Sequence, residues 1–252
     1  MRSLFIVAVG SFAALAPLCA APACSSLATQ TLSTYIAQGA TGCDVGQYNF
    51  SHFDWLATIV SVNTNSVDAD SIIVTAHDNG AAGPSLDFDL NWHTVTSILP
   101  VAANATLAFR VLSNQPSNYF LTSSSLYVDA TGTGLLGTAI VTEENCVGGL
   151  FTGNLCLLPG GLGSTGSVGL GGLINTGVGT QVAVAPFLAP VTTLDVLKTI
   201  TLASAGTLIT PSTVSLNSFT ESFGSSTPEP ATWVLFSTCL ALMIASRYRR
   251  SA

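Results

Sequence analysis

Side chains that could act as bases or metal ligands are sparse in this sequence. The chain has three histidines: His52, His77 and His93. Asp87, Asp89, Asn91 and His93 alternate with apolar residues, which places them together on one face of an extended strand. Carboxylates at this spacing are about 6 to 7 Å apart and could bind Ca²⁺, which prefers oxygen ligands. Asp87 and Asp89 are therefore candidate calcium ligands, although a solvent-facing polar edge is the simpler interpretation, and no other cofactor is indicated.

The sequence lacks the motifs of nucleophilic catalysis. It contains neither G-x-S-x-G nor S-x-x-K. Three acid pairs occur: Asp68/Asp70, Asp87/Asp89 and Glu143/Glu144. Glycoside hydrolysis needs two carboxyl groups across a cleft, and spacing alone does not establish one. We therefore expect a non-catalytic protein, with a secreted hydrolase as the second alternative.

Two tryptophans could stack on sugar rings, because an indole offers a wide apolar face. Trp55 lies beside the polar pair His52 and Asp54, which we interpret as part of a solvated face. Trp92 occupies the same strand face as the apolar residues Leu86, Phe88 and Leu90, so we expect it in the core.

Four cysteines lie between the two apolar ends of the chain: Cys24, Cys43, Cys146 and Cys156. An even number in an exported protein indicates disulfides. We favour Cys24–Cys43 and Cys146–Cys156, because pairs that are near in sequence close the smallest loops. Each of these two pairs also brackets a turn-rich segment. A zinc site is not indicated, because these four cysteines show no C-x₂₋₄-C spacing and there is no histidine pair.

The charge balance excludes several classes of partner. Of 252 residues, 8% are charged, against about 25% in average soluble domains, and the mean hydropathy is +0.56. Residues 24–227 contain two basic residues, Arg110 and Lys198, against twelve acidic ones, a formal net charge of −10. Nucleic-acid binding requires clustered Lys and Arg to neutralise phosphates. We therefore expect no nucleic-acid partner and no basic patch for anionic membranes.

Residues 1–23 have the three parts of a secretory signal peptide. Arg2 supplies the positive charge, Leu4 to Leu18 is apolar, and Ala21-Pro22-Ala23 fits the small-x-small site for signal peptidase. The apolar stretch is shorter than the roughly 20 residues that span a bilayer. Acylation at Cys24 is the alternative, but Ala21 stands where lipoprotein signals usually have Leu.

Residues 228–252 have the features of a second targeting segment, at the C-terminal end. Pro228-Glu229-Pro230 follows a Ser/Thr spacer and precedes an apolar run, which we expect to form a short transmembrane helix at about 231–246. Its length of roughly 25 Å is marginal for a bilayer core of about 30 Å. Three arginines after the run act as a stop on the cytoplasmic side: Arg247, Arg249 and Arg250. An ordinary C-terminal anchor is the alternative.

This arrangement of Pro-Glu-Pro, short helix and basic tail resembles the PEP-CTERM sorting signal of exopolysaccharide-producing Gram-negative bacteria. The sorting signal covers about a tenth of the chain. The pattern of the remaining sequence also resembles PEP-CTERM ectodomains of acidobacterial type. It implies that an exosortase, an integral-membrane transpeptidase, cuts near the triplet. The protein would be held in the inner membrane with its C-terminus cytoplasmic, and then pass to the envelope or the exterior, where exopolysaccharide is a further partner.

Between the ends, apolar residues recur with a period of two, which is typical of half-buried strands. The clearest runs are at 86–93, 106–112, 124–129, 194–202 and 212–223, the last with Phe219 and Phe223 on its odd face; Lys198 interrupts the apolar face of its own run. Further strands are expected at 48–60, 71–76, 136–143 and 181–187, and a short helix within 26–39. About nine short strands separated by turn residues predict a single antiparallel β-sandwich over residues 24–227.

One segment departs from this pattern. Residues 159–180 carry many glycines and little side chain to bury, so we expect a long flexible loop there. The segment contains a literal G-x-G-x-x-G at 161–166. A dinucleotide site also needs a following helix and an acid about 20 residues on, and neither is present.

These observations predict an all-β exported protein, flanked by a signal peptide and a short membrane helix. Its expected role is structural or adhesive, in the envelope or in exopolysaccharide. The alternative is a carbohydrate-binding module, with or without Ca²⁺ at Asp87 and Asp89.

Overall fold

The computed structural model describes residues 21–24, 30–59, 65, 67–96, 101–133, 136–152, 155–158, 161–162, 165–174, 179–205 and 212–227. Almost all of the predicted signal peptide, and the whole sorting signal at 228–252 with its expected membrane helix, lie outside these residues. Within them, no helix is both long enough and apolar enough to cross a bilayer.

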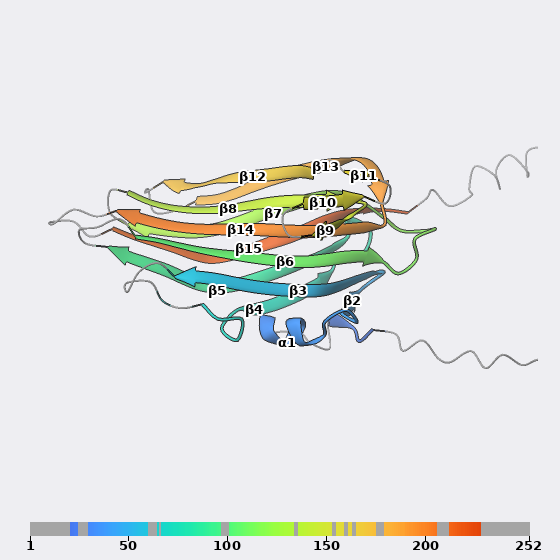
Figure 1. Cartoon of the computed structure of the whole chain (residues 1–252), viewed down its shortest axis with the longest axis horizontal. Helices are drawn as coiled ribbons and strands as arrows, with labels where there is room; N and C mark the ends of the chain where they lie inside the picture. Colours follow the sequence, from blue (N-terminus) through green and yellow to red (C-terminus); the bar gives the residue numbers. More distant parts are fainter. Residues whose placement is uncertain are drawn as a thin grey trace, which may run out of the picture.

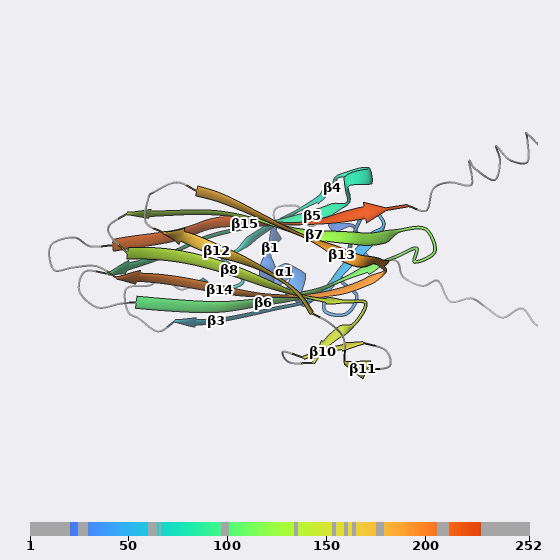
Figure 2. The ribbon, with the colours of Figure 1, turned by 90° about the horizontal axis from the view of Figure 1, so that it is seen from above.

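Two six-stranded sheets form the body of the molecule (Figures 1 and 2). Sheet A contains, in spatial order, β12 (Thr165–Ile174), β8 (Leu136–Val147), β14 (Thr193–Ala205), β6 (Val101–Ser113), β3 (Tyr48–Ile59) and β2 (Cys43–Val45). Sheet B contains β1 (Gln30–Thr31), β4 (Ile73–Asp78), β5 (Pro84–Thr96), β15 (Ser212–Ser226), β7 (Phe120–Thr133) and β13 (Gly179–Val191).

The remaining elements are small. β9 (Leu150–Thr152), β10 (Leu155–Leu158) and β11 (Gly161–Leu162) form a three-stranded sheet, α1 (Leu32–Ala37) is the only α-helix among the described residues, and η2 (Gly80–Ala82) is a single 3₁₀ turn. The strand pairs are antiparallel. The predicted all-β fold with antiparallel sheets in a sandwich-like arrangement is confirmed.

Aromatic rings from both sheets meet in the core. Phe88 and Phe219 of sheet B stack with centroids 4.7 Å apart, and Phe53 and Phe109 of sheet A stack at 5.4 Å. Phe88 and Phe109 join the two pairs across the layers at 6.3 Å. Burying each phenyl ring contributes roughly 1.5 to 3 kcal/mol, so these rings are a main source of attraction between the sheets.

A bulge in β15 changes which alternate residues of that strand face the core. Opposite β7, the pairing shifts between Leu216 and Ser218, leaving Asn217 as an extra residue. Val214 and Leu216 are buried at even positions before the bulge, while Phe219 and Phe223 are buried at odd positions after it. The odd-face prediction is therefore confirmed after the bulge and wrong before it, because the extra residue reverses the alternation.

The described residues of the glycine-rich segment form strands and not the predicted loop. β12 pairs with β8 from Thr165↔Cys146 to Ile174↔Thr138, at the edge of sheet A, and β11 pairs with β10. The prediction of a long loop at 159–180 was wrong because it weighed side-chain burial alone. Backbone hydrogen bonds to an existing edge form without side chains.

The N-terminal segment is fastened to sheet A. Cys24 and Cys43 form a disulfide, as predicted, and the Asp44 backbone N–H donates to Pro22 O at 2.8 Å. The predicted helix within 26–39 is present in shortened form as α1, whose buried Leu32 and Tyr35 face the core. Burial raises the pKa of Tyr35 to about 12, so its phenol stays neutral.

We predict that Gly83→Ala strongly destabilises the sandwich. Gly83 has φ +96°, and a β-carbon there would lie 1.9 Å from the carbonyl oxygen of Phe223. Overpacking against backbone, added to strain at positive φ, should lower the free energy of unfolding by about 3 kcal/mol or more in urea titration. Gly80→Ala is the matched control, since Gly80 also has positive φ but a β-carbon there meets nothing within 4 Å. Equal losses in the two variants would refute the close contact.

Candidate functional site

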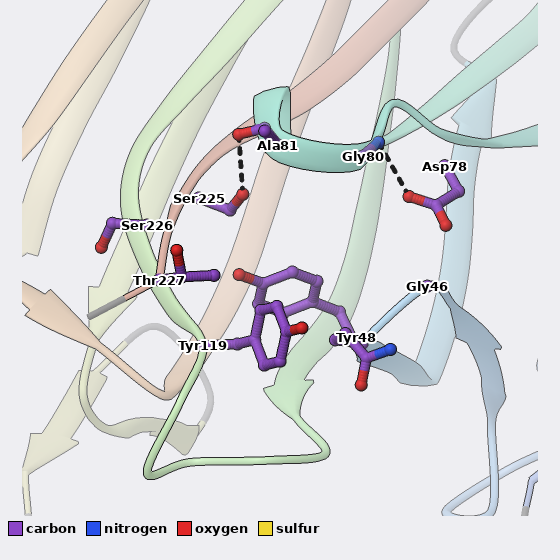
Figure 3. A pocket seen from close by; sticks show the side chains of 10 residues that line it. Gly46, Tyr48, Asp78, Gly80, Ala81, Tyr119, Ser225, Ser226 and Thr227 are labelled. Carbon is purple, nitrogen blue, oxygen red and sulfur yellow. Dashed lines mark hydrogen bonds between the residues drawn. The ribbon is translucent and has the colours of Figure 1, made fainter. Parts of the chain in front are cut away.

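A pocket opens at the end of the sandwich where β15 finishes (Figure 3). Its volume is about 570 Å³, within the roughly 300–1,000 Å³ of typical small-molecule sites. We call it the tyrosine pocket, and the residues lining it are Gly46, Gln47, Tyr48, Asp78, Gly80, Ala81, Tyr119, Ser225, Ser226 and Thr227. It thus joins the start of β3, the β4–β5 turn, the segment before β7 and the end of β15.

Two phenol rings occupy the centre of the tyrosine pocket (Figure 3). Tyr48 and Tyr119 meet edge to face, with centroids 6.5 Å apart and planes at 80°. The Tyr48 hydroxyl donates to Phe120 O at 3.2 Å. Burial raises the pKa of Tyr48, so this phenol remains a neutral donor. Tyr48 is fixed in the wall, while Tyr119 is only partly buried.

Hydrogen-bond donors and acceptors surround the two rings. Asp78 Oδ1 accepts the Gly80 N–H at 3.0 Å, which leaves its second oxygen available as an acceptor among these contacts. The Ser225 hydroxyl donates to Ala81 O at 3.1 Å, and Gln47 Oε1 accepts from Gln115 at 2.9 Å. A β-carbon on Gly46 would lie 2.8 Å from Asp78 Oδ2, so glycine at this position keeps the carboxylate in place.

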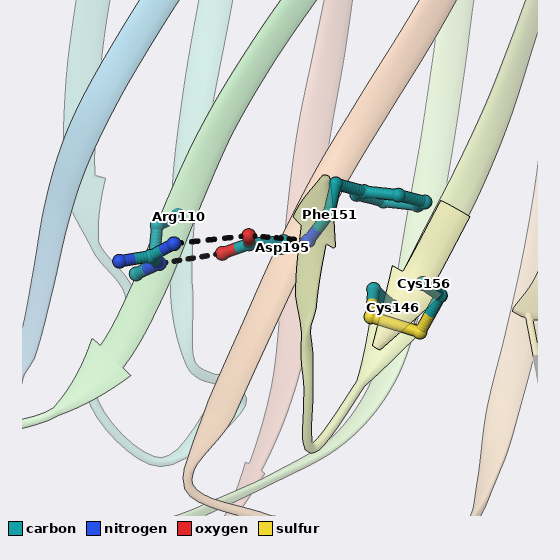
Figure 4. The surroundings of a disulfide bond; sticks show 5 residues. All are labelled: Arg110, Cys146, Phe151, Cys156 and Asp195. Atoms are coloured by element: carbon teal, nitrogen blue, oxygen red, sulfur yellow. Dashed lines mark hydrogen bonds and ion pairs between the residues drawn. A yellow bond between two sulfur atoms is a disulfide. The ribbon is translucent and has the colours of Figure 1, made fainter. Parts of the chain in front are cut away.

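A second hollow lies on the outer face of sheet A, beside the pair Arg110 and Asp195 (Figure 4). Its volume is about 410 Å³, and His52 and Asp54 also line it. Arg110 donates from Nε and Nη2 to the two oxygens of Asp195, at 2.6 and 3.1 Å. The planar fork of guanidinium matches a carboxylate in this way.

The Cys146–Cys156 disulfide, predicted from the sequence, holds the β9–β10 hairpin over this pair. The Phe151 N–H donates to Asp195 Oδ2 at 2.9 Å, so one carboxylate binds both the hairpin and Arg110. The phenyl ring of Phe151 points away from Arg110 (Figure 4). Phe109 and Phe151 are also among the residues that line the hollow. Because Asp195 binds both Arg110 and the hairpin, we interpret the charged pair mainly as a support for the hairpin.

The other sequence candidates are separate from both hollows. The Asp87 carboxylate accepts a hydrogen bond from His77 Nε2 at 2.8 Å, and this contact competes with metal binding. Asp89 is exposed on the same strand. Within the described ranges, no group of three or more His, Cys, Asp or Glu side chains could hold a metal ion.

The two tryptophans lie at the core. Trp92 is fully buried, as predicted, and Trp55 packs against it edge to face at 6.4 Å. Their indole N–H groups donate to Asn65 O and Val67 O at 3.1 and 3.0 Å. The Trp92 ring is therefore not available as an open sugar platform, whereas Trp55 is partly buried.

Sequence reasoning missed a buried charged cluster between the sheets. Lys198 Nζ contacts Glu143 Oε2 and lies 2.5 Å from Glu221 Oε2, and all three residues are fully buried. Ser124 Oγ contacts Glu143 and lies 2.9 Å from Glu221 Oε1, while Asn145 Nδ2 donates to Glu143 at 2.5 Å. A usable signal existed: each charged residue occupies an inward-facing position of its strand.

The cluster contains two carboxyl groups but only one cation, Lys198. The two glutamates therefore differ in how readily they bind a proton. Burial opposes the charged form of Glu143, but Lys198 and the surrounding donors outweigh it and lower its pKa to about 2. Burial, together with repulsion from Glu143, raises the pKa of Glu221 well above its usual range. Burial alone would lower the pKa of Lys198, yet the two glutamates raise it. Of the two carboxyl groups, Glu221 is therefore the one that holds a proton more readily, and the cluster is neutral when it does.

Comparison with known proteins gives no family for this chain. No family model and no curated protein matches it. Among solved structures, the carbohydrate-binding module TmCBM61 in complex with beta-1,4-galactotriose is 7% identical, covers 76% of this chain and 97% of its own, and has a TM-score of 0.29. TmCBM27, described as recognising mannan, is 11% identical over 70% of this chain and 99% of its own, with a TM-score of 0.23.

A third match is the enzymatically active domain of tailspike protein 4 from bacteriophage CBA120. It is 13% identical, covers 75% of this chain and 21% of its own, and has a TM-score of 0.27. At such TM-scores and identities, the ligand must be argued from this chain's own residues.

We predict that Asp195→Asn loosens the hairpin. The variant keeps the shape of the side chain but removes the charge that holds Arg110, so it should lower the free energy of unfolding by about 1 to 3 kcal/mol in urea titration. Hydrogen exchange at the Phe151 amide should quicken as well. Asp54→Asn, on the same outer face, is the control and should change neither quantity. An unchanged midpoint for Asp195→Asn would show that the pair contributes nothing to the hairpin.

Proposed function

We propose that this chain is an exported, non-catalytic protein that binds a neutral saccharide in the tyrosine pocket. The observation that carries the proposal is the composition of that pocket. Two tyrosine rings, a carboxylate, an amide and three hydroxyl-bearing residues converge on one cavity of about 570 Å³. The fold supports this role only in a general way, because a β-sandwich can serve many functions.

The chemistry of a sugar matches this combination. A pyranose presents C–H groups on its faces, which pack on aromatic rings, and hydroxyl groups at its edge, which need both donors and acceptors. Tyr119 offers the ring, Asp78 an acceptor, and Gln47 both kinds of group. Ser226 and Thr227 add hydroxyls at the rim.

Charge favours a neutral ligand over an anionic one. Residues 24–227 carry a formal net charge of −10, and Asp78 is the acidic residue in the pocket wall. A uronic acid or sulfated chain would be repelled as it approached. A calcium-dependent mode at Asp87 and Asp89 is less favoured, because His77 already contacts Asp87.

Delivery to the envelope completes the proposal. Both disulfides fit an oxidising compartment outside the cytoplasm. Signal peptidase would remove residues 1–23, and an exosortase would act near Pro228, Glu229 and Pro230 while the apolar run and Arg247, Arg249 and Arg250 hold the chain in the inner membrane. The triplet directly follows Thr227 in the sequence, so the proposed binding pocket adjoins the site of processing, with exopolysaccharide as the expected ligand.

The binding test uses the full chain and a panel of neutral oligosaccharides in titration calorimetry. We expect one or more members to bind, and Tyr119→Ala or Asp78→Asn to weaken that binding by at least about tenfold, a loss of about 1.4 kcal/mol. Tyr127→Ala is the matched control, because Tyr127 is 40% exposed on sheet B and does not line the pocket. Failure of the whole neutral panel, or equal affinity in all three variants, would overturn the proposed site.

Processing is tested separately by intact-mass analysis of protein recovered from a host that contains an exosortase. We expect the mature chain to lack residues 1–23 and the segment after the triplet. Replacing Pro228 and Pro230 together with Ala should leave the C-terminal segment attached. Replacing Ser225 and Ser226 with Ala is the control. Recovery of the unaltered full-length chain from the cytosol would contradict the export proposal.

A further inference from the structure

The buried cluster between the sheets brings an amine and a carboxyl group together without solvent. Lys198 comes from β14 of sheet A and Glu221 from β15 of sheet B, and Nζ lies 2.5 Å from Oε2. Both side chains have no exposed surface. The Phe219 ring covers the ammonium from one side, with its centroid 5.6 Å from Nζ.

We propose that Lys198 and Glu221 become joined by an intramolecular amide bond, formed by the folded chain itself with Glu143 as the proton carrier. The bond would connect Lys198 Nζ to Glu221 Cδ and release one water molecule. It would link the two sheets covalently, through strands that the disulfides do not connect. This inference is independent of the proposed saccharide site.

The two carboxyl groups are distinguished by their hydrogen bonds. Glu143 receives contacts from Lys198, Ser124 and Asn145, the last at 2.5 Å, and so many donors favour a carboxylate anion. Glu221 is hydrogen bonded to Lys198 and Ser124, and its carboxyl group also interacts with that of Glu143. A Ser124 hydroxyl has one proton to donate, so a protonated Glu221 can donate to Ser124 while Ser124 donates to Glu143. Glu221 is accordingly the electrophile, since amines attack neutral carboxyl groups far better than carboxylates.

The reaction balances without a co-reactant. Lys198 first passes a proton from its ammonium to the Glu143 carboxylate, which makes the amine nucleophilic. Nζ then forms a bond to Cδ of the protonated Glu221, and the C=O electron pair moves to oxygen. In the collapse, Glu143 gives its proton to the departing hydroxyl and takes one from nitrogen, so that the C–OH bond breaks and water leaves. The product is a neutral amide beside a protonated Glu143.

Burial favours this outcome in two ways. Holding the groups in contact replaces a bimolecular encounter by an intramolecular one, which is worth many powers of ten in effective concentration. The reaction also removes two buried charges, whose desolvation is costly even when they are paired. The reaction also leaves Glu143 protonated, which gives a hydrogen-bond donor beside Asn145. The Oδ1 atom of Asn145 is buried without a hydrogen-bond partner among the described residues.

The decisive experiment is mass spectrometry on the full chain after reduction, alkylation and denaturation. We expect a mass lower than the sequence requires by one water molecule. Trypsin offers a second readout, because Arg110, Lys198 and Arg247 are consecutive cleavage sites. An acylated Lys198 is not cleaved, so residues 111–247, or to the processed end, should remain one species. Tandem fragmentation of a peptic digest should then show peptides containing Lys198 and Glu221 joined.

Variants test the assigned roles. Lys198→Met should restore the full expected mass, and Glu143→Gln should abolish or greatly slow the loss of water. Glu144→Gln is the matched control, since its side chain is exposed on the same strand, and it should form the bond like the wild type. An unmodified wild-type mass with normal cleavage at Lys198 would overturn the proposal, whether or not the variants fold. Loss of ammonia, or a junction at Glu143 or Asn145, would overturn Glu221 as the acceptor.

Discussion

The Nζ atom of Lys198 lies between a carboxyl group of its own sheet and one of the facing sheet, with no exposed surface on any of the three side chains. An unpaired charge in such a place would cost several kcal/mol. Close packing of the sheets at this point therefore requires Glu143, Lys198 and Glu221 to meet. Apolar contacts between the sheets, such as Phe88 against Phe109, tolerate small sliding, whereas this cluster does not, so it selects one alignment of β14 and β15.

The alignment of β15 has consequences at both of its ends. The bulge at Asn217 lets residues before and after it reach the core. Four residues beyond Glu221 the strand reaches Ser225, which donates to Ala81 and enters the tyrosine pocket. The pocket wall is thus built by the same strand that carries the inter-sheet contact, and a shift of β15 would change the position of Thr227 in that wall.

Local features of this fold could be predicted from the sequence. The alternation from Leu86 to His93 predicted β5, and the short separations of 19 and 10 residues favoured the two disulfides that the structure contains. The glycine-rich strand β12 could not be predicted, because its pairing with β8 depends on a backbone edge that only the folded sheet supplies. The bulge at Asn217 likewise has no signal in a period-two pattern.

Long-range features were harder. Lys198 was visible as an interruption of an apolar face, but its partners are 55 and 23 residues away, and single-strand periodicity does not pair strands. Tyr48 and Tyr119 lie at strand ends, where alternation carries no information, and the pocket between them depends on the order of strands in two sheets. Among the described residues, Asp87 and Asp89 belong to no group of three or more His, Cys, Asp or Glu side chains that could hold a metal ion.

The central claim, that the tyrosine pocket is the binding site, can be tested most directly by nuclear magnetic resonance with isotopically labelled tyrosine rings. The chain has five tyrosines: Tyr35, Tyr48, Tyr119, Tyr127 and Tyr248. On titration with a neutral oligosaccharide that binds, the account predicts saturable shifts of the Tyr48 and Tyr119 signals, with Tyr35 and Tyr127 unchanged. Saturable binding that leaves Tyr48 and Tyr119 unshifted would contradict it.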